Sequence, residues 1–471
     1  MVEITRSIPV AELLSGVTLD SREGNPEALC RVTDVCVDSR NCSEGSLFVP
    51  LPGDTADGHF FIEHALKKGS ALCFVNRQFF HKHKEKFFEF QKKYSALFLV
   101  VPDSLTALQD LARERMRRMA NLCVIGITGS NGKTTTKEIL GSILKSYDST
   151  AINPGNLNSD IGLPMAALAV EDSHRFAIFE LGINRPSEMD ILVDIIRPHA
   201  AAITNIGNAH IGPLGSRRAI AEEKRKIFRF LAPEHAGYIF EKDDFVDFLQ
   251  EAGEGIKTYG PASTPDYEGF QDLGLEGSII NWRGHAIAFP LIGSYNVINA
   301  LCAISLALEI GVSDDAIIDG LQKVRPLFGR GMVLEGGITV IQDCYNANSD
   351  SMFQAIEFVD SLSLTGRKIL ILGSMKELGA DTYIEHRHVG FRAADSTADI
   401  VFFFGEESAA AYDAAQENRG GAQEPEFYLL LDFCELKKVV SDTVRNGDLV
   451  LLKGSRSVEL ERLMDTLKKS V

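Results

Sequence analysis

The sequence lacks the features of a membrane-spanning or secreted protein. It contains no uninterrupted apolar run of the roughly 18 residues that a bilayer-spanning helix needs, and no hydrophobic segment of the signal-peptide type at its amino end. The eight cysteines show no Cys-x-x-Cys spacing, so neither a disulfide framework nor a zinc site is indicated. We therefore expect a cytoplasmic protein with no membrane span.

Positive charge is also scarce. The 471 residues carry a formal net charge of −17 at pH 7. A surface that neutralises phosphates is normally basic, so this balance argues against broad binding of nucleic acid or of an anionic membrane. The hydrophobic content of 45% and the charged content of 24% are ordinary for a globular chain, whose length leaves room for about three domains.

Three regions with different patterns follow one another along the chain. Residues 1–102 contain short apolar runs broken by Gly and Asp, which is typical of a small α/β domain. Residues 103–325 and 326–471 each alternate strand and helix patterns, and the linker-like segment VRPLFGRG separates them. Such alternation predicts mainly parallel sheets covered by helices, with ligands at the carboxyl ends of the strands. We expect an α/β protein of three domains, the last of Rossmann-like type.

The segment GITGSNGKTTTKEIL, residues 126–140, places closely spaced glycines between a buried strand and a helix. Such a turn can aim several backbone N–H groups at one anion, while the helix N-terminus and Lys133 add positive charge. The Thr134 hydroxyl would ligate the Mg²⁺ that accompanies a nucleoside triphosphate. The pattern predicts a central P-loop mononucleotide-binding domain. Because Ile127 stands where the generic pattern has glycine, a plain glycine-rich turn with a surface lysine stays open as the alternative.

Polar residues follow the strands that come next. Glu180 ends the strand FAIFEL and is a candidate Mg²⁺ ligand or water holder, or else an ordinary acid at a strand end. Asn205 ends the segment AAITN, and His210 follows on a glycine-bordered loop, where a histidine is either a ligand or a surface residue. Lys224 lies in SRRAIAEEKRKIF, a pattern that is typical of a solvated cluster of charges.

Taken together, these segments resemble the Mur ligases, the ATP-dependent family that builds the peptide stem of bacterial cell-wall precursors. The resemblance extends over nearly the full length. The Mur ligases also share the incomplete phosphate-loop pattern. The blocks that carry it are VDSRNCSEGSLFVPLPGDTADGHFFIEHALKKG (37–69), TGSNGKTT (128–135), NLNSDIGLP (156–164), ELGIN (180–184), NIGNAHIGPLGS (205–216), YNVINALCAI (295–304), DCYNANSDSM (343–352), LGSMKELG (372–379) and LLKGSRS (451–457).

Within the family, the Tyr-Asn-Ala-Asn and Met-Lys-Glu-Leu-Gly segments are similar to those of the type that takes D-alanyl-D-alanine. The Asn-Pro-Arg segment of the relatives that add diaminopimelate or lysine is absent. The resemblance implies ATP-dependent joining of D-alanyl-D-alanine to UDP-N-acetylmuramoyl-tripeptide through an acyl phosphate. It further implies that residues 1–102 bind the UDP-sugar, residues 103–325 bind ATP, and residues 326–471 bind D-alanyl-D-alanine.

The resemblance also implies roles for single residues. Catalytic positions of the family match Lys133, Glu180, His210 and Lys224. Two Mg²⁺ sites would be formed by Thr134, Glu180, His210 and Lys224, the last as a carbamate derived from CO₂. An unmodified lysine is a cation that would oppose a metal ion, and the carbamate reverses that sign.

The remaining implied contacts are with ATP and the two substrates. The ATP phosphates would meet Thr128, Gly129, Ser130, Asn131, Gly132, Lys133 and Thr134. The adenosine would meet Asn296, Asn299, Arg330 and Asp343, and the UDP-sugar would meet Asp38, Ser39 and Arg40. Further substrate contacts would come from Asn156, Asn158, Asn346, Asn348, Glu377 and His386.

Other readings remain open. A relative that uses another amino acid or a folate is one, although no folate-type pattern is found. A P-loop kinase or transport ATPase is another, and a catalytically inactive scaffold is a third. We expect a monomer that binds small molecules, while the sequence leaves open whether the third stem residue is diaminopimelate or lysine.

Overall fold

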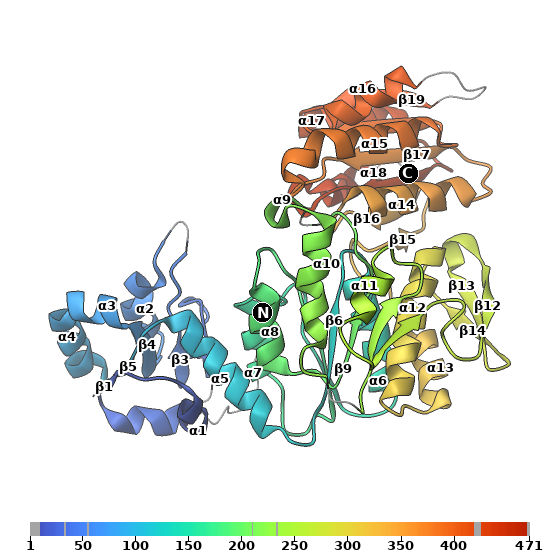
Figure 1. Cartoon of the computed structure of the whole chain (residues 1–471). Helices are drawn as coiled ribbons and strands as arrows, with labels where there is room; N and C mark the ends of the chain where they lie inside the picture. Colours follow the sequence, from blue (N-terminus) through green and yellow to red (C-terminus); the bar gives the residue numbers. More distant parts are fainter. Residues whose placement is uncertain are drawn as a thin grey trace.

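The chain was analysed as a computed structural model, which describes residues 10–32, 34–53, 56–209, 211–231, 234–418 and 425–468 (Figure 1). It forms an N-terminal unit, a central unit and a C-terminal unit, each built on a sheet with helices. The expected α/β class with mainly parallel sheets is therefore confirmed. No helix in the described ranges is long and apolar enough to cross a membrane, whereas the monomeric state and the cytoplasmic location stay predictions.

The N-terminal unit contains a five-stranded sheet of order β1-β5-β4-β3-β2, in which β1 runs antiparallel to β5 and the other pairs are parallel. No disulfide was expected from the cysteine spacing, but Cys36 and Cys42 are joined across the turn that follows β2, with Cα atoms 6.0 Å apart. The elements are α1 (Val10–Leu13), β1 (Ser21–Gly24), β2 (Asp34–Cys36), β3 (Ser46–Phe48), α2 (Ile62–Lys67), β4 (Leu72–Asn76), α3 (Arg77–Lys82), α4 (Lys84–Tyr94) and β5 (Leu97–Val101).

The central unit contains a six-stranded sheet of order β11-β10-β9-β6-β8-β7, all of whose pairs are parallel. A small antiparallel sheet, β12-β13-β14, lies at its edge. The strands are β6 (Cys123–Thr128), β7 (Thr150–Ile152), β8 (Phe176–Glu180), β9 (Ala200–Ile203), β10 (Gly237–Phe240), β11 (Ile256–Tyr259), β12 (Tyr267–Asp272), β13 (Ser278–Trp282) and β14 (His285–Phe289). The helices are α6 (Lys133–Lys145), α7 (Gly162–Leu168), α8 (Glu188–Ile196), α9 (Ile211–Leu214), α10 (Arg217–Arg225), α11 (Val246–Gln250), α12 (Ser294–Glu309) and α13 (Asp314–Lys323).

The C-terminal unit contains a second six-stranded sheet, of order β15-β16-β20-β17-β18-β19. Only the β15–β16 pair among these strands is antiparallel. The elements are β15 (Met332–Leu334), β16 (Thr339–Asp343), α14 (Ser349–Ser361), β17 (Lys368–Gly373), α15 (Thr382–Ala394), β18 (Ile400–Phe404), α16 (Ala409–Glu417), β19 (Glu426–Leu430), α17 (Phe433–Thr443), β20 (Leu449–Lys453) and α18 (Met464–Leu467).

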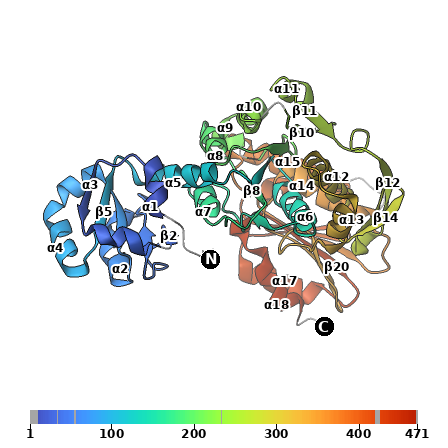
Figure 2. The ribbon, with the colours of Figure 1, turned by 90° about the horizontal axis from the view of Figure 1, so that it is seen from below.

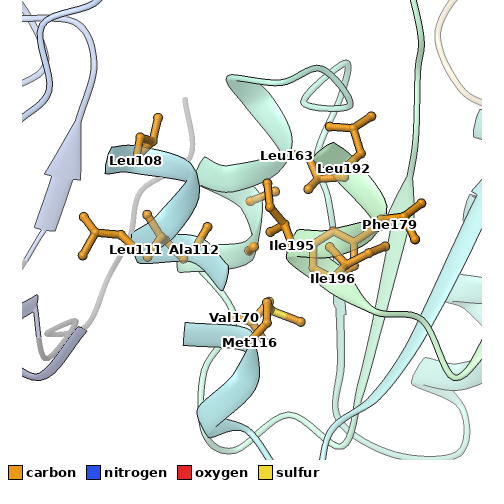
Figure 3. Packing of buried hydrophobic residues seen from close by; sticks show 14 of the residues in the cluster. Leu108, Leu111, Ala112, Met116, Leu163, Val170, Phe179, Leu192, Ile195 and Ile196 are labelled. Carbon is orange, nitrogen blue, oxygen red and sulfur yellow. The ribbon is translucent and has the colours of Figure 1, made fainter. Parts of the chain in front are cut away.

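Helix α5 (Ser104–Arg118) connects the N-terminal unit to the central unit (Figure 2). Its apolar residues recur at helical spacing, and its buried side packs on α7 and α8. Figure 3 shows this contact, in which Met116 of α5 lies beside Val170, while Leu111 points to the opposite side of the helix. Burial of such side chains is the main favourable term in packing, so α5 is a firmly packed connection.

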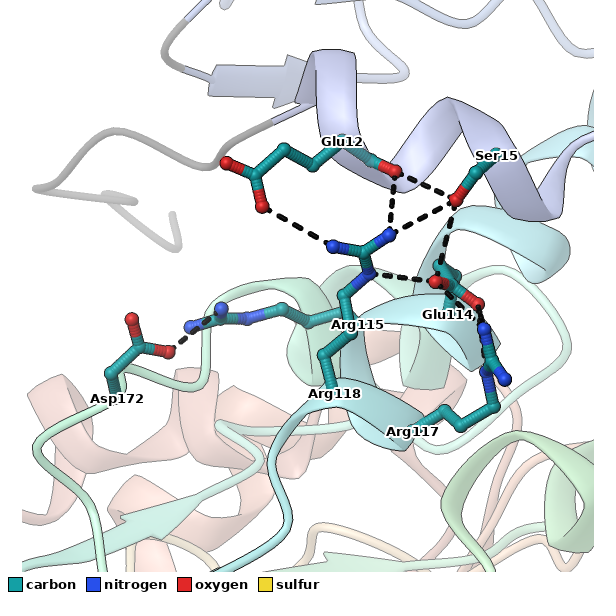
Figure 4. Close-up of polar contacts among 7 residues, drawn as sticks. All are labelled: Glu12, Ser15, Glu114, Arg115, Arg117, Arg118 and Asp172. Atoms are coloured by element: carbon teal, nitrogen blue, oxygen red, sulfur yellow. Dashed lines mark hydrogen bonds and ion pairs between the residues drawn. The ribbon is translucent and has the colours of Figure 1, made fainter.

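Polar contacts also hold α5 in place (Figure 4). Arg118 donates to the Glu12 carbonyl at 3.1 Å and pairs with the buried Glu114 at 2.6 Å. Arg115 donates to the Val170 carbonyl at 2.6 Å and pairs with Asp172 at 2.8 Å. One helix is therefore bonded to elements on both sides of the junction.

Candidate functional site

The turn between β6 and α6 is fastened to the end of β9. The backbone N–H of Thr204 donates to the Thr128 carbonyl at 2.8 Å, and that of Ser130 donates to the Asn205 carbonyl at 2.9 Å. The Asn131 N–H donates to Oδ1 of Asn205, also at 2.9 Å. These bonds fix the path of the turn that the sequence predicts to bind phosphate.

Two glycines make this turn geometrically feasible. Gly129 has φ +151°, and a Cβ there would lie 1.8 Å from Oγ1 of Thr204. Gly132 has φ +78°, and its Cβ would lie 2.4 Å from Oδ1 of Asn299. Glycine is required because a side chain at either position meets both a rare backbone conformation and a filled space.

Lys133 begins α6 and is half-buried. Its Nζ donates to the carbonyls of Gly129 at 2.8 Å and Ser130 at 3.2 Å, so the amine lies over its own turn. Burial lowers the pKa of this amine, while the charge of Glu180 raises it and that of Arg330 lowers it. A phosphate at the turn would give Lys133 a charged acceptor in place of carbonyls.

A cavity of about 240 Å³ opens in front of this turn, between the carboxyl ends of the two six-stranded sheets. Most of the predicted site residues meet in it. They are Ser130, Asn131, Gly132, Lys133, Thr134, Asn156, Asn158, Glu180, Asn296, Arg330, Asp343, Asn346, Asn348 and Glu377. Cavity residues that the sequence analysis missed include Asn184, Tyr295, Gln354 and Lys453.

Glu180 is the cavity residue best suited to a divalent cation. It ends β8 and is buried, and its Oε1 accepts a bond from Nδ2 of Asn158 at 2.9 Å. Its Oε2 is buried without a hydrogen-bond partner, and its cationic neighbour is Nζ of Lys137 at 3.8 Å. An unsatisfied buried carboxylate oxygen that shares the cavity with Thr134 fits Mg²⁺, which prefers such oxygen ligands.

The described residues contain no group of three or more His, Cys, Asp or Glu that could hold a metal ion. Mg²⁺ bound with a nucleotide needs no such group, because one or two protein oxygens and the phosphates suffice. His210, the other predicted ligand, lies outside the described residues.

Lys224 lies behind the phosphate turn and does not line the cavity. It belongs to α10, its side chain is buried, and its Nζ donates to the Gly129 carbonyl at 2.9 Å. Burial and the charge of Lys133 bring the pKa of Lys224 well below its usual value. The solvated cluster suggested by the sequence is therefore absent at this position, although its neighbour Lys226 pairs with Asp190 and Glu223 at 2.7 Å.

Contacts across the cavity join the C-terminal unit to the phosphate turn. Asn348 donates through Nδ2 to Oδ1 of Asn131 at 2.8 Å, while its own Oδ1 caps α14 by accepting from the Ser351 N–H. Arg330 donates to Oγ1 of Thr134 at 3.3 Å and lies over the ring of Tyr345. The two units are thus in contact at the cavity.

A second cavity of about 620 Å³ adjoins the turn on the side of α12. Asn299 lines it together with Asn131 and Gly132, and Nδ2 of Asn299 donates to Oδ1 of Asn296 at 3.1 Å. The residues expected to hold adenosine therefore border two adjoining cavities, with Asn296, Arg330 and Asp343 facing the first.

Some predicted residues lie away from both cavities. Arg40 pairs with Asp38 at 2.7 Å and Ser39 contacts His64 at 3.0 Å, all within the N-terminal unit. His386 is buried, and its Nε2 accepts from the Met375 N–H at 3.0 Å. The other ring nitrogen of His386 therefore donates to the Thr382 carbonyl, so this histidine supports the loop before Glu377.

Known proteins match the chain along nearly its full length. The family descriptions that match are "Mur ligase family, catalytic domain" over residues 31–116, "Mur ligase middle domain" over 127–307 and "Mur ligase, glutamate ligase domain" over 329–456. The UDP-N-acetylmuramoyl-tripeptide–D-alanyl-D-alanine ligase of Treponema pallidum is 38% identical over 92% of this chain and 94% of its own. The ligase of the same name from Bacillus subtilis is 33% identical over 93% of each.

Solved structures of ligases of the same family are also similar to this chain. A crystal structure of MurF from Acinetobacter baumannii superposes with a TM-score of 0.84 at 28% identity, covering 98% of both chains. The MurF ligase of Thermotoga maritima, solved in complex with ADP, gives a TM-score of 0.78 at 26% identity and covers 94% of this chain and 98% of that one.

The close approach of Gly132 to Asn299 generates a test. We predict that Gly132→Ala raises the dissociation constant for ADP at least about tenfold, or about 1.4 kcal/mol, because the new methyl group displaces Asn299 and strains the turn. Titration calorimetry measures the effect. Gly215→Ala is the control, since Gly215 has φ +85° but nothing within 4 Å of its Cβ position. Equal losses in both variants would contradict the assignment of the turn as the nucleotide site.

Proposed function

This chain belongs to the Mur ligase family, and we propose that it joins D-alanyl-D-alanine to UDP-N-acetylmuramoyl-tripeptide with ATP, releasing ADP and phosphate. The observation that carries the proposal is the cavity in which the phosphate turn faces residues 343–348 of the C-terminal unit. A ligase of this kind must bring a phosphoryl donor and two substrates together, and this cavity lies at the sheet edges where such ligands bind.

The three units divide the binding in this proposal. Residues 1–102 hold the UDP-sugar, residues 103–325 hold ATP and residues 326–471 hold D-alanyl-D-alanine. Arg40 supports the first assignment, because its side chain is 82% exposed even while it pairs with Asp38, so its guanidinium can be reached by a diphosphate from solvent. Asn346 and Glu377 support the third, because both face the phosphate turn from the C-terminal unit.

Amide formation from a free carboxylate is unfavourable in water, so the acid must first be activated. The terminal carboxylate of the tripeptide attacks the γ-phosphorus of ATP, the bond to the ADP oxygen breaks, and an acyl phosphate forms. Lys133 and the backbone N–H groups of the turn stabilise the transferring charge. The dipeptide amine then attacks the acyl carbon, loses a proton, and phosphate leaves from the tetrahedral intermediate.

Thr134 and Glu180 would hold Mg²⁺, with His210 and a carbamate on Lys224 at a second site. Bound Mg²⁺ neutralises negative charge on the phosphoryl oxygens. Water would destroy an acyl phosphate, and the contacts of Arg330 with Thr134 and of Asn348 with Asn131 bring the C-terminal unit against the turn at which it would form.

The carbamate rests on the surroundings of Lys224. A neutral amine reacts with CO₂, forming an N–C bond and releasing one proton, and a lowered pKa leaves more of the amine neutral at pH 7. The product is an anion close to Lys133, so repulsion between two lysines becomes attraction.

The reaction itself is tested by phosphate release. We expect Mg²⁺-dependent release from ATP only when UDP-N-acetylmuramoyl-tripeptide and D-alanyl-D-alanine are both present, and mass analysis should find the joined product. Lysine-containing and diaminopimelate-containing precursors, tested separately, identify the third stem residue. Release without the dipeptide would favour a kinase or transport ATPase, and no release with any precursor would favour a scaffold.

Modification of Lys224 is tested with ¹³CO₂. We expect one carbamate signal by ¹³C NMR at pH 7 in the unaltered protein and in Lys226→Ala, and none in Lys224→Ala. Lys226 is the matched control because its ion pairs raise its pKa and keep its amine charged. Lys224→Ala should also lose turnover, and full activity in that variant would contradict the role.

A further inference from the structure

Lys453 is a buried lysine at the cavity for which the proposed mechanism has no use. It ends β20, is 2% exposed, and lines the cavity next to Asp343. A buried ammonium is costly unless it is paired, so the partners of this side chain indicate its purpose.

Two bonds from Lys453 reach the same loop. Nζ pairs with Oδ2 of Asp343 at 2.7 Å and donates to the Asn346 carbonyl at 3.4 Å. Asp343 and Lys453 end adjacent parallel strands in direct register, which brings the two side chains together. Lys453 thus joins the end of β20 to the loop that follows β16, which faces the phosphate turn.

The pairing with Lys453 occupies one of the two carboxylate oxygens of Asp343. Among the described residues, its hydrogen bond involves Oδ2, so Oδ1 is left for a ligand in the cavity. Each carboxylate oxygen has two lone pairs. A carboxylate held through one oxygen can therefore still accept hydrogen bonds from two vicinal hydroxyl groups, through its other oxygen or through the remaining lone pair of the first. The ribose of a nucleotide carries such a pair of hydroxyl groups.

We propose that Lys453 is a positioning residue that orients Asp343 toward the ribose hydroxyls of the nucleotide. The inference rests on the proposed function, because it takes Asp343 as a contact of the adenosine. Lys453 acts through Asp343, and its removal leaves that carboxylate free to rotate away from the ligand.

The test compares ADP with 2′,3′-dideoxy-ADP by titration calorimetry. The unaltered protein should bind ADP more tightly than the dideoxy compound. In Lys453→Met the affinity for ADP should fall about tenfold, the scale of losing a hydrogen bond to a charged group, and the two compounds should bind almost equally. Lys453→Arg should restore part of the difference, and Asp343→Asn should remove it.

Arg367→Met is the matched control. Arg367 pairs with the buried Asp448 at 2.7 Å at the opposite end of the same sheet, away from the cavity. It should lower the thermal unfolding midpoint while leaving the preference for ADP over the dideoxy compound unchanged. A preference that persists in Lys453→Met would overturn the proposal, and phosphate release that still requires both substrates would show that the proposed function survives.

Discussion

The hydrogen bonds between the turn after β6 and the end of β9 are the constraint on which the rest of the site depends. They hold the turn where Gly129 and Gly132 have no room for a side chain, so that Lys133 and Thr134 begin α6 facing the cavity. The same turn receives Lys224 from behind and Asn348 from the C-terminal unit. The charges and dipoles around a phosphate bound there are already in place before binding. Such preorganisation is the condition for strong electrostatic stabilisation.

Parallel sheets explain why residues from distant parts of the chain meet at this turn. The carboxyl ends of β6 and β8 deliver the phosphate turn and Glu180, and the end of β16 delivers Asp343 from the facing unit. Each strand brings its polar end residue to one edge, and two such edges opposed to each other form the cavity. Helix α5 joins the N-terminal unit to the central unit: its apolar side packs on α7 and α8, Arg115 bonds to Val170 of the central unit, and Arg118 bonds to Glu12 of the N-terminal unit.

Local patterns in the sequence were enough to predict the α/β class, the glycine-rich turn between β6 and α6 and the position of Glu180 at a strand end. Burial of Lys224 could not be predicted from spacing, because its flanking charges are typical of a solvated helix and only tertiary packing separates it from Lys226. Lys453 was missed because its contact with Asp343 depends on β20 entering the sheet beside β16, 110 residues away in the chain. The ring of His386 has both nitrogens bonded to backbone, a detail that requires the loop geometry.

We infer that the turn at Gly129–Thr134 binds the phosphates of ATP, with a divalent cation at Glu180. A crystal structure with a non-hydrolysable ATP analogue and Mn²⁺ is the decisive experiment, because anomalous scattering locates the metal. We expect phosphates against the backbone N–H groups of the turn and a Mn²⁺ peak beside Oε2 of Glu180 and Oγ1 of Thr134. A nucleotide bound elsewhere, or a metal peak remote from Glu180, would contradict it.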